Sequence, residues 1–263
     1  MKPSRAKKAE ELCESILQGE IAYNSENEIL PSESEIAERL LANSLSMKCV
    51  YVEVYDKLQA DYSKISCLLR SFLSVAAFWS PGKNESARAA RIEIGDTNRK
   101  IARLATELSG LIDRRTELHD SSGFSSNTHY HVCDVIDAAA TKVPEFHSYV
   151  SDHLKSLAAE FDLKYWPSLS DFMRALSVDA LEADVVATDS ITESATRSTR
   201  TSKADYFRAL LTMIEENVTA TNEGFRLSDK ALAIIGNCAL DFDPDEMVDE
   251  AYVKRLRQRA RGG

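Results

Sequence analysis

The histidines of this chain are clustered, and two of them lie close to a cysteine. All five histidines fall between residues 119 and 153, and the stretch "THYHVCD" contains His129, His131 and Cys133. Imidazole and thiolate groups are common zinc ligands, but a zinc site needs three or four of them. On a strand the three side chains would share a face, whereas on the helix that "VCDVIDAAA" predicts only His129 and Cys133 do. The three residues are a candidate metal site, with ordinary hydrogen-bonding histidines as the alternative.

A second candidate is the stretch "RRTELH", in which Arg114 and His119 are separated by four residues. This spacing resembles the motif of HEPN ribonucleases, which are helical proteins. The resemblance implies that Arg and His from two subunits meet at a dimer interface, where the His moves a proton and the Arg stabilises phosphate charge. On an ideal helix such a pair lies about 140° apart, so His119 must lie past the helix end for the two to converge. The alternative is a solvated helix end.

The C-terminal stretch "VKRLRQRARGG" is basic, although the formal net charge of the chain is -10. Its cations are Lys254, Arg255, Arg257, Arg259 and Arg261. Such a cluster can dock on an acidic protein or on nucleic acid. The alternative is a solvated helix end, where cations are favoured by the negative end of the helix dipole.

The acidic stretch "DFDPDEMVDE", residues 241–250, predicts a helix start. An EF-hand loop that began at Asp241 would need Gly at position 246 and Glu at position 252, where the chain has Glu246 and Tyr252. Asp243 followed by Pro244 is typical of an N-cap and a first helical residue. A helix is therefore expected from residue 244.

The composition favours a binding protein over an enzyme. The sequence contains no glycine-rich phosphate loop, no G-x-S-x-G elbow and no HExxH motif, and no cofactor is expected. The five widely spaced cysteines favour reduced thiols. The longest apolar stretch, "SFLSVAAFW", is too short for a membrane span, and the first residues lack the apolar core of a signal peptide. We expect a cytoplasmic protein with no membrane partner.

The apolar spacing of three and four residues predicts an all-α fold. Its most regular part is a heptad seam with one polar position, Arg115, and this seam predicts a long helix over residues 92–119, in a helical hairpin arm. The seam consists of Ile101, Leu104, Leu108, Leu111 and Leu118. Ser32 with Glu35, and Ser168 with Asp171, are typical of capping boxes. Further helices are expected at 5–22, 46–78, 128–141, 145–161, 169–187, 204–219, 229–240 and 244–259.

These elements predict the order of the segments. Pro81, Gly82 and the polar residues after them indicate a hinge, and nine of the sixteen residues from 188 to 203 are Ser or Thr, which predicts a mobile loop. The expected segments are a helix-turn-helix-like part (1–80), the hinge (81–91), a helical domain (92–187), the loop (188–203), and C-terminal helices that pack on the helical domain and end in the basic tail (204–263).

Residues 12–58 resemble the DNA-binding domain of the GntR family of bacterial regulators. The matching stretches are "ELCESILQGEI", "LPSESEIAERL" and, as the recognition helix, "SMKCVYVEVYDKL". The resemblance implies a winged helix that docks in the major groove as a dimer, followed by a helical ligand-binding domain. Residues 1–61 carry seven basic and twelve acidic side chains, whereas phosphate contacts need an excess of Lys and Arg. This charge favours protein contacts.

The leading hypothesis is a non-catalytic all-α binding protein, an accessory or regulatory subunit that acts through protein-protein contacts. Two alternatives stay open: a GntR-like transcription regulator with a helical ligand-sensing domain, and a HEPN-like ribonuclease that uses Arg114 and His119. The two resemblances suggest a bacterial mobile-element or phage-defence setting. The expected partner is a protein, while nucleic acid bound by the helix-turn-helix-like part or the basic tail, and a homodimer, remain options.

Overall fold

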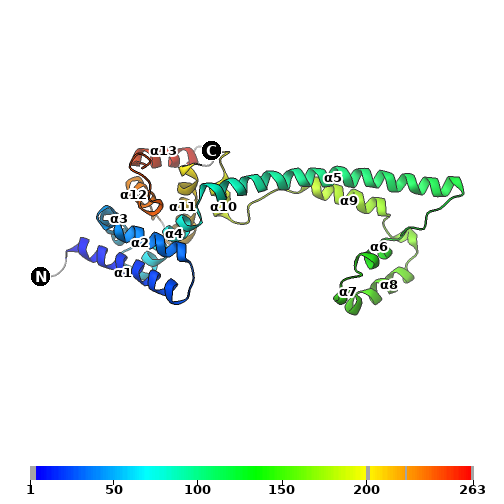
Figure 1. Cartoon of the computed structure of the whole chain (residues 1–263), viewed down its shortest axis with the longest axis horizontal. Coiled ribbons are helices and arrows are strands. Elements are labelled where there is room, and N and C mark those ends of the chain that lie inside the picture. The colour runs from blue at the N-terminus through cyan, green and yellow to red at the C-terminus, as the bar shows by residue number, and fades with distance from the viewer. Residues whose placement is uncertain (1–3, 200–201, 223, 262–263) are drawn as a thin grey trace. The chain divides into compact units, whose positions relative to one another are not determined.

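The fold is all-α (Figure 1). The structure, a computed structural model, describes residues 4–199, 202–222 and 224–261, and these residues contain no β-strand. No helix in these ranges combines the length and the hydrophobicity that a membrane span requires. The chain divides into two compact units, and unit 1 combines residues 1–89 with residues 186–263, whereas unit 2 is the segment 90–185 between them.

Unit 1 is built from helices at both ends of the chain. Its elements are α1 (Arg5–Glu26), α2 (Pro31–Ala42), α3 (Ser44–Lys57), α4 (Tyr62–Phe78), the first turns of α5 (Pro81–Ser122), α10 (Ser190–Thr196), α11 (Lys203–Asn217), η2 (Thr219–Thr221), α12 (Asp229–Leu240) and α13 (Glu250–Arg261). Helix α4 lies at the centre and contacts α1, α2, α11 and α12. Its side chains Ile65, Leu68, Leu69, Phe72 and Leu73 are fully buried.

The C-terminal helices therefore pack on the N-terminal ones in unit 1, whereas the sequence predicted that they pack on the helical domain. The reason lies in their apolar faces. Tyr206, Phe207 and Leu210 of α11 and Leu232 and Ile235 of α12 belong to the same core as the buried face of α4. Each such side chain contributes about 1.5–3 kcal/mol when it leaves water.

Several helix ends in the N-terminal half differ from the prediction. Helix α2 begins at Pro31, which suits the first helical position, and the Ser32–Glu35 capping box does not form. The expected helix 46–78 is two helices, because Gln59 and Ala60 have left-handed φ angles of 54° and 58°. A single residue, Asn43, separates α2 from α3.

The expected hinge at residues 81–91 is helical. Ser80 caps α5 by accepting a hydrogen bond from the Lys83 amide at 3.1 Å, and Pro81 is the first helical residue. Proline is tolerated there because the amide it lacks would have no partner in the first turn. The proline and glycine that suggested a break mark the start of a 42-residue helix.

The expected mobile loop at 188–203 contains a helix, α10, which is capped by Asp189. Hydrogen bonds from Thr192 keep the pKa of Asp189 below its usual value. Arg88 donates to the carbonyl groups of Ala195 (3.0 Å) and Ser198 (2.6 Å), and Arg208 donates to that of Ser194 (3.1 Å). Long-range arginine contacts therefore fix the described part of this segment, and residues 200 and 201 lie outside the description.

Asp205 is the centre of this arrangement and its side chain is fully buried. Its carboxylate pairs with Arg88 at 2.6 Å and with Arg208, and it accepts hydrogen bonds from the Ser198 hydroxyl (2.8 Å) and the Ser202 amide (3.0 Å). A buried charge is stable only when it is paired and hydrogen-bonded, as here.

The last helix begins later than expected. Residues 244–246 form a turn, and α13 starts at Glu250 with the Tyr252 amide donating to Asp249 at 2.8 Å. The Asn237 side chain bonds both the amide and the carbonyl of Val248, each at 2.9 Å. These contacts engage the backbone of Val248 outside any helix, so the helix expected from Pro244 does not form across this residue.

Unit 2 contains most of α5 together with α6 (Val132–Ala139), α7 (Pro144–Tyr149), α8 (Ser151–Glu160), η1 (Leu163–Tyr165) and α9 (Leu169–Glu182). Helix α9 runs alongside α5 (Figure 1), and the Ser177 hydroxyl donates to the Ala102 carbonyl at 2.8 Å. The buried residues between them are small, and include Ala102, Ala105 and Ala180. The Ser168–Asp171 capping box of α9 is confirmed.

Candidate functional site

The residues of the candidate metal site do not converge. Helix α6 begins at Val132, so His129 lies outside the helix and does not share a helical face with Cys133. His131 is the N-cap of α6: its Nδ1 accepts the Cys133 amide at 3.0 Å, and its ring packs against Trp166 at 4.9 Å. Nowhere in the described ranges do three His, Cys, Asp or Glu side chains gather in a way that could hold a metal ion.

Arg114 and His119 are engaged separately. Arg114 pairs with Glu117 at 2.8 Å, while His119 Nε2 lies 2.9 Å from the Ser126 hydroxyl. Helix α5 continues to Ser122, so His119 lies within the helix and not past its end. The condition under which the two side chains of one chain could converge is therefore not met.

The basic tail forms the exposed part of helix α13. Lys254, Arg255 and Arg259 are exposed, and the Arg261 side chain lies outside the described residues. Arg257 differs, because its guanidinium donates to the Leu227 carbonyl at 2.9 Å, forms an ion pair with Asp229 and is only 12% exposed. Arg257 thus ties α13 to the loop before α12, and three of the five predicted docking residues are available at the surface.

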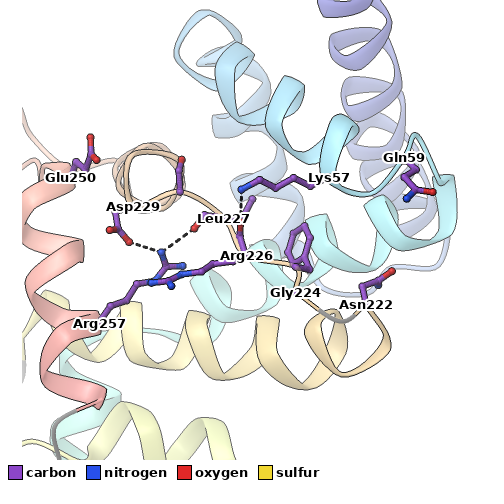
Figure 2. A pocket seen from close by; sticks show the side chains of 11 residues that line it. Lys57, Gln59, Asn222, Gly224, Arg226, Leu227, Asp229, Glu250 and Arg257 are labelled. Carbon is purple, nitrogen blue, oxygen red and sulfur yellow. Dashed lines mark hydrogen bonds and ion pairs between the residues drawn. The ribbon is translucent and has the colours of Figure 1, made fainter.

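A groove of about 740 Å³ adjoins this helix within unit 1 (Figure 2). Its walls come from the end of α3, from the loop at residues 222–228 and from α12 and α13. The lining residues include the cations Lys57, Arg226 and Arg257 and the carboxylates Asp229 and Glu250. The predicted tail residue Arg257 therefore lies at a concave surface that the sequence did not indicate.

One wall of the groove is fixed by Glu53 of α3. Its carboxylate accepts the Ser228 amide and hydroxyl, both at 2.6 Å, and pairs with Lys57 at 2.7 Å. Burial raises the pKa of Glu53, but the hydrogen bonds from Lys57 and Ser228 outweigh it and hold that pKa below its usual value. Lys57 also donates to the Arg226 carbonyl at 2.5 Å (Figure 2). These contacts hold the loop against α3.

The loop presents Arg226 to solvent. Phe225 and Leu227 are buried in the core, whereas Arg226 between them is exposed, as alternation along an extended segment requires. No described acidic side chain forms an ion pair with Arg226. Lys57 and Arg257 pair with Glu53 and Asp229, so Arg226 is the lining cation without a described ion pair, as Glu250 is the lining carboxylate without one.

No family model matches the chain, and no curated protein or solved structure is detectably similar to it. The α13 cations can be recognised in the sequence as a basic cluster, whereas Lys57, Glu53 and Arg226 do not stand out there. A local signal existed for Arg226, since "GFRLSD" places a cation between two large apolar residues after a glycine. The role of Glu53 depends on Ser228, far along the chain, and has no local signal.

The pKa of Glu53 predicts a pH dependence of stability. Because it is lower in the folded state, the ionised carboxylate stabilises the fold above the ordinary glutamate pKa, about 4.3. This contribution is lost as the pH falls through the folded value. We expect Glu53→Gln to lower the free energy of unfolding by about 1–3 kcal/mol at neutral pH and by less in acid. Urea unfolding across this pH range measures the difference.

Glu26→Gln is the matched control, because Glu26 is exposed and forms no ion pair in the described part of the chain. An equal effect of the two substitutions at every pH would show that Glu53 does not hold the loop.

Proposed function

We propose that this protein is a non-catalytic binding protein, an accessory or regulatory subunit that docks an acidic segment of a partner protein. The observation that carries the proposal is a group of cations without a described ion pair, namely Arg226 in the groove and the three exposed cations of the neighbouring helix α13. Lys254, Arg255 and Arg259 form no ion pair with a described carboxylate, although the chain as a whole is acidic. Lys254 lies toward the face of α13 that lines the groove, whereas Arg255 and Arg259 lie near Tyr252 on another face. The proposed docking surface therefore comprises Arg226 and Lys254.

The lining of the groove suits a peptide better than a nucleic acid. Nucleic acids carry a charge on every phosphate and are bound by runs of Lys and Arg. Here Asp229, Glu250 and Glu53 lie among the cations, so a phosphate backbone would meet carboxylates along the groove. A protein segment can place its own acidic side chains opposite Arg226 and its backbone elsewhere. Arginine is also enriched at protein interfaces.

Affinity purification of the tagged full-length chain from its native cells, with and without nuclease, tests the proposal. We expect a protein that co-purifies in stoichiometric amount and stays bound after nuclease treatment. Arg226→Glu should reduce the recovery of this protein on the order of tenfold. Mass spectrometry measures the protein, and absorbance measures nucleic acid in the same eluate.

Lys8→Glu is the control, because it makes the same charge change on an exposed residue of α1. Equal loss of the partner in both variants would refute docking at the groove. Recovery of DNA alone, removed by nuclease, would favour the GntR-like regulator over a protein-binding subunit. Loss of cellular RNA that depends on Arg114 and His119 would favour a ribonuclease.

A further inference from the structure

The apolar seam of α5 is exposed in the structure. Ile94, Ile101, Leu104, Leu108 and Leu111 have between 39% and 62% of their surface open to solvent. With exposed Thr97 they occupy successive a and d positions of three heptads, the pattern by which one helix packs on another. A soluble protein rarely exposes such a row unless another chain covers it.

Helix α9 packs on another face of α5. The buried α5 residues on this face are Ala102, Ala105 and Ser109, and Thr106 and Asp113 bond to Ser177 and Arg174 of α9. These positions are b, e and f of the heptads, so the a and d seam stays open within the described part of unit 2. The seam has room for one more helix.

The charges beside the seam alternate in sign. The g positions are Glu93, Lys100, Glu107 and Arg114, all exposed and seven residues apart. Within α5, Glu107 lies 3.8 Å from Arg103, and Arg114 pairs with Glu117. Such exposed pairs within one helix are weak and exchange partners easily. Residues at e and g set the orientation and partner of a coiled coil.

We propose that the occupant of the seam is a second copy of this chain, packed antiparallel against it. In an antiparallel pair, g positions face g positions. When the two g rows are centred on each other, with the two-fold axis between residues 103 and 104, Glu93 lies opposite Arg114 of the second copy. Lys100 then lies opposite Glu107 of the second copy. The same pairs recur on the other side of the axis, so all four are attractive.

The same register fills the core of the seam. Ile101 lies in a layer with Leu104 of the second copy, Ile94 with its Leu111, and Leu108 with its Thr97. The two-fold axis repeats each layer. The paired stretch from residue 94 to residue 111 is about 27 Å long. Five of the six seam positions thus face a large apolar residue of the second copy, and the sixth, Leu108, faces Thr97.

Other arrangements of two copies lack this complementarity. A shift of the register by one heptad in one direction sets Glu107 opposite Glu107 of the second copy. The same shift in the other direction sets Lys100 opposite Lys100, so both shifts place like charges together. In a parallel, in-register pair the g residues face Asn98, Ala105, Ile112 and His119, which offer no carboxylate or Lys. The charge pattern therefore selects one register, and the inference is independent of the groove on unit 1.

Charge reversal on the full-length chain tests the register. Lys100→Glu alone sets like charges opposite each other twice, and so does Glu107→Lys, so each variant should dimerise on the order of tenfold more weakly than the wild type. An equimolar mixture of the two variants restores attraction at both pairs and should form heterodimers. The double variant has the wild-type net charge and should recover the homodimer. Sedimentation velocity over a concentration series measures all four.

Arg99→Glu is the control, because this exposed residue lies away from the seam and makes the same charge change as Lys100→Glu. It should leave the dissociation constant unchanged. A wild-type chain that stays monomeric at high micromolar concentration would overturn the proposal. A dimer that is insensitive to the single reversals, or that the double variant fails to recover, would overturn the register.

Discussion

Asp205→Ala is expected to lower the free energy of unfolding of unit 1 by about 3–5 kcal/mol. The carboxylate is fully buried between Arg88 and Arg208, whose side chains are themselves mostly buried. Without it, two guanidinium groups would lie together with no carboxylate, and the Ser202 amide would lose its acceptor. Removal of one partner from a buried charge network costs far more than the loss of an exposed ion pair.

Tryptophan fluorescence can follow this unfolding within unit 1. The chain has two tryptophans, Trp79 in unit 1 and Trp166 in unit 2, so a Trp166→Phe background leaves one reporter. Urea titration of that background with and without Asp205→Ala gives the difference. Asp205→Asn keeps the size of the side chain and one oxygen that can still accept a hydrogen bond, so it should cost less.

Asp245→Ala is the control, since Asp245 is exposed in the turn before α13. If Asp205→Ala changed stability as little as this surface substitution, the ion-pair network would not fix the segment between α10 and α11.

Which parts of the fold could be predicted depends on the range of the interactions that decide them. The helix of the Leu104 and Leu108 seam follows from local periodicity, and it is confirmed as part of α5. The conformation of residues 190–199 depends on the contact between Arg88 and Asp205, which are more than 100 residues apart. The Ser and Thr content of the segment cannot predict that contact. The start of α13 likewise depends on Asn237.

The candidate site shows the same division. A row of cations is visible in any sequence, so the exposed Lys254, Arg255 and Arg259 could be predicted. Whether a given arginine is free depends on what the fold places beside it, and only the structure separates Arg257, held by Asp229, from Arg226. His129 and Cys133 do not lie on one helical face because α6 begins at Val132. A local sequence pattern specifies such a helix boundary only within a few residues.

Gly236→Ala should destabilise unit 1 by about 1–3 kcal/mol, although alanine is the better helix former by about 1 kcal/mol. A Cβ atom at Gly236 would lie 2.6 Å from Cζ and 2.9 Å from Cε1 of Phe207. That ring is fully buried and packs edge-on against Tyr206 at 5.2 Å and Tyr252 at 6.0 Å. Because aromatic rings lie around it, Phe207 cannot move aside without disturbing the core.

Gly19→Ala in α1 separates the clash from helix propensity, because no atom lies within 4 Å of a Cβ built there. It should raise stability by about 1 kcal/mol. In a double-mutant cycle, Phe207→Leu should remove much of the cost of Gly236→Ala, since the shorter side chain leaves room for the methyl group. Thermal unfolding of the four variants measures this coupling. A stabilising Gly236→Ala, or costs that simply add, would show that α12 and α11 do not approach each other as closely as this glycine allows.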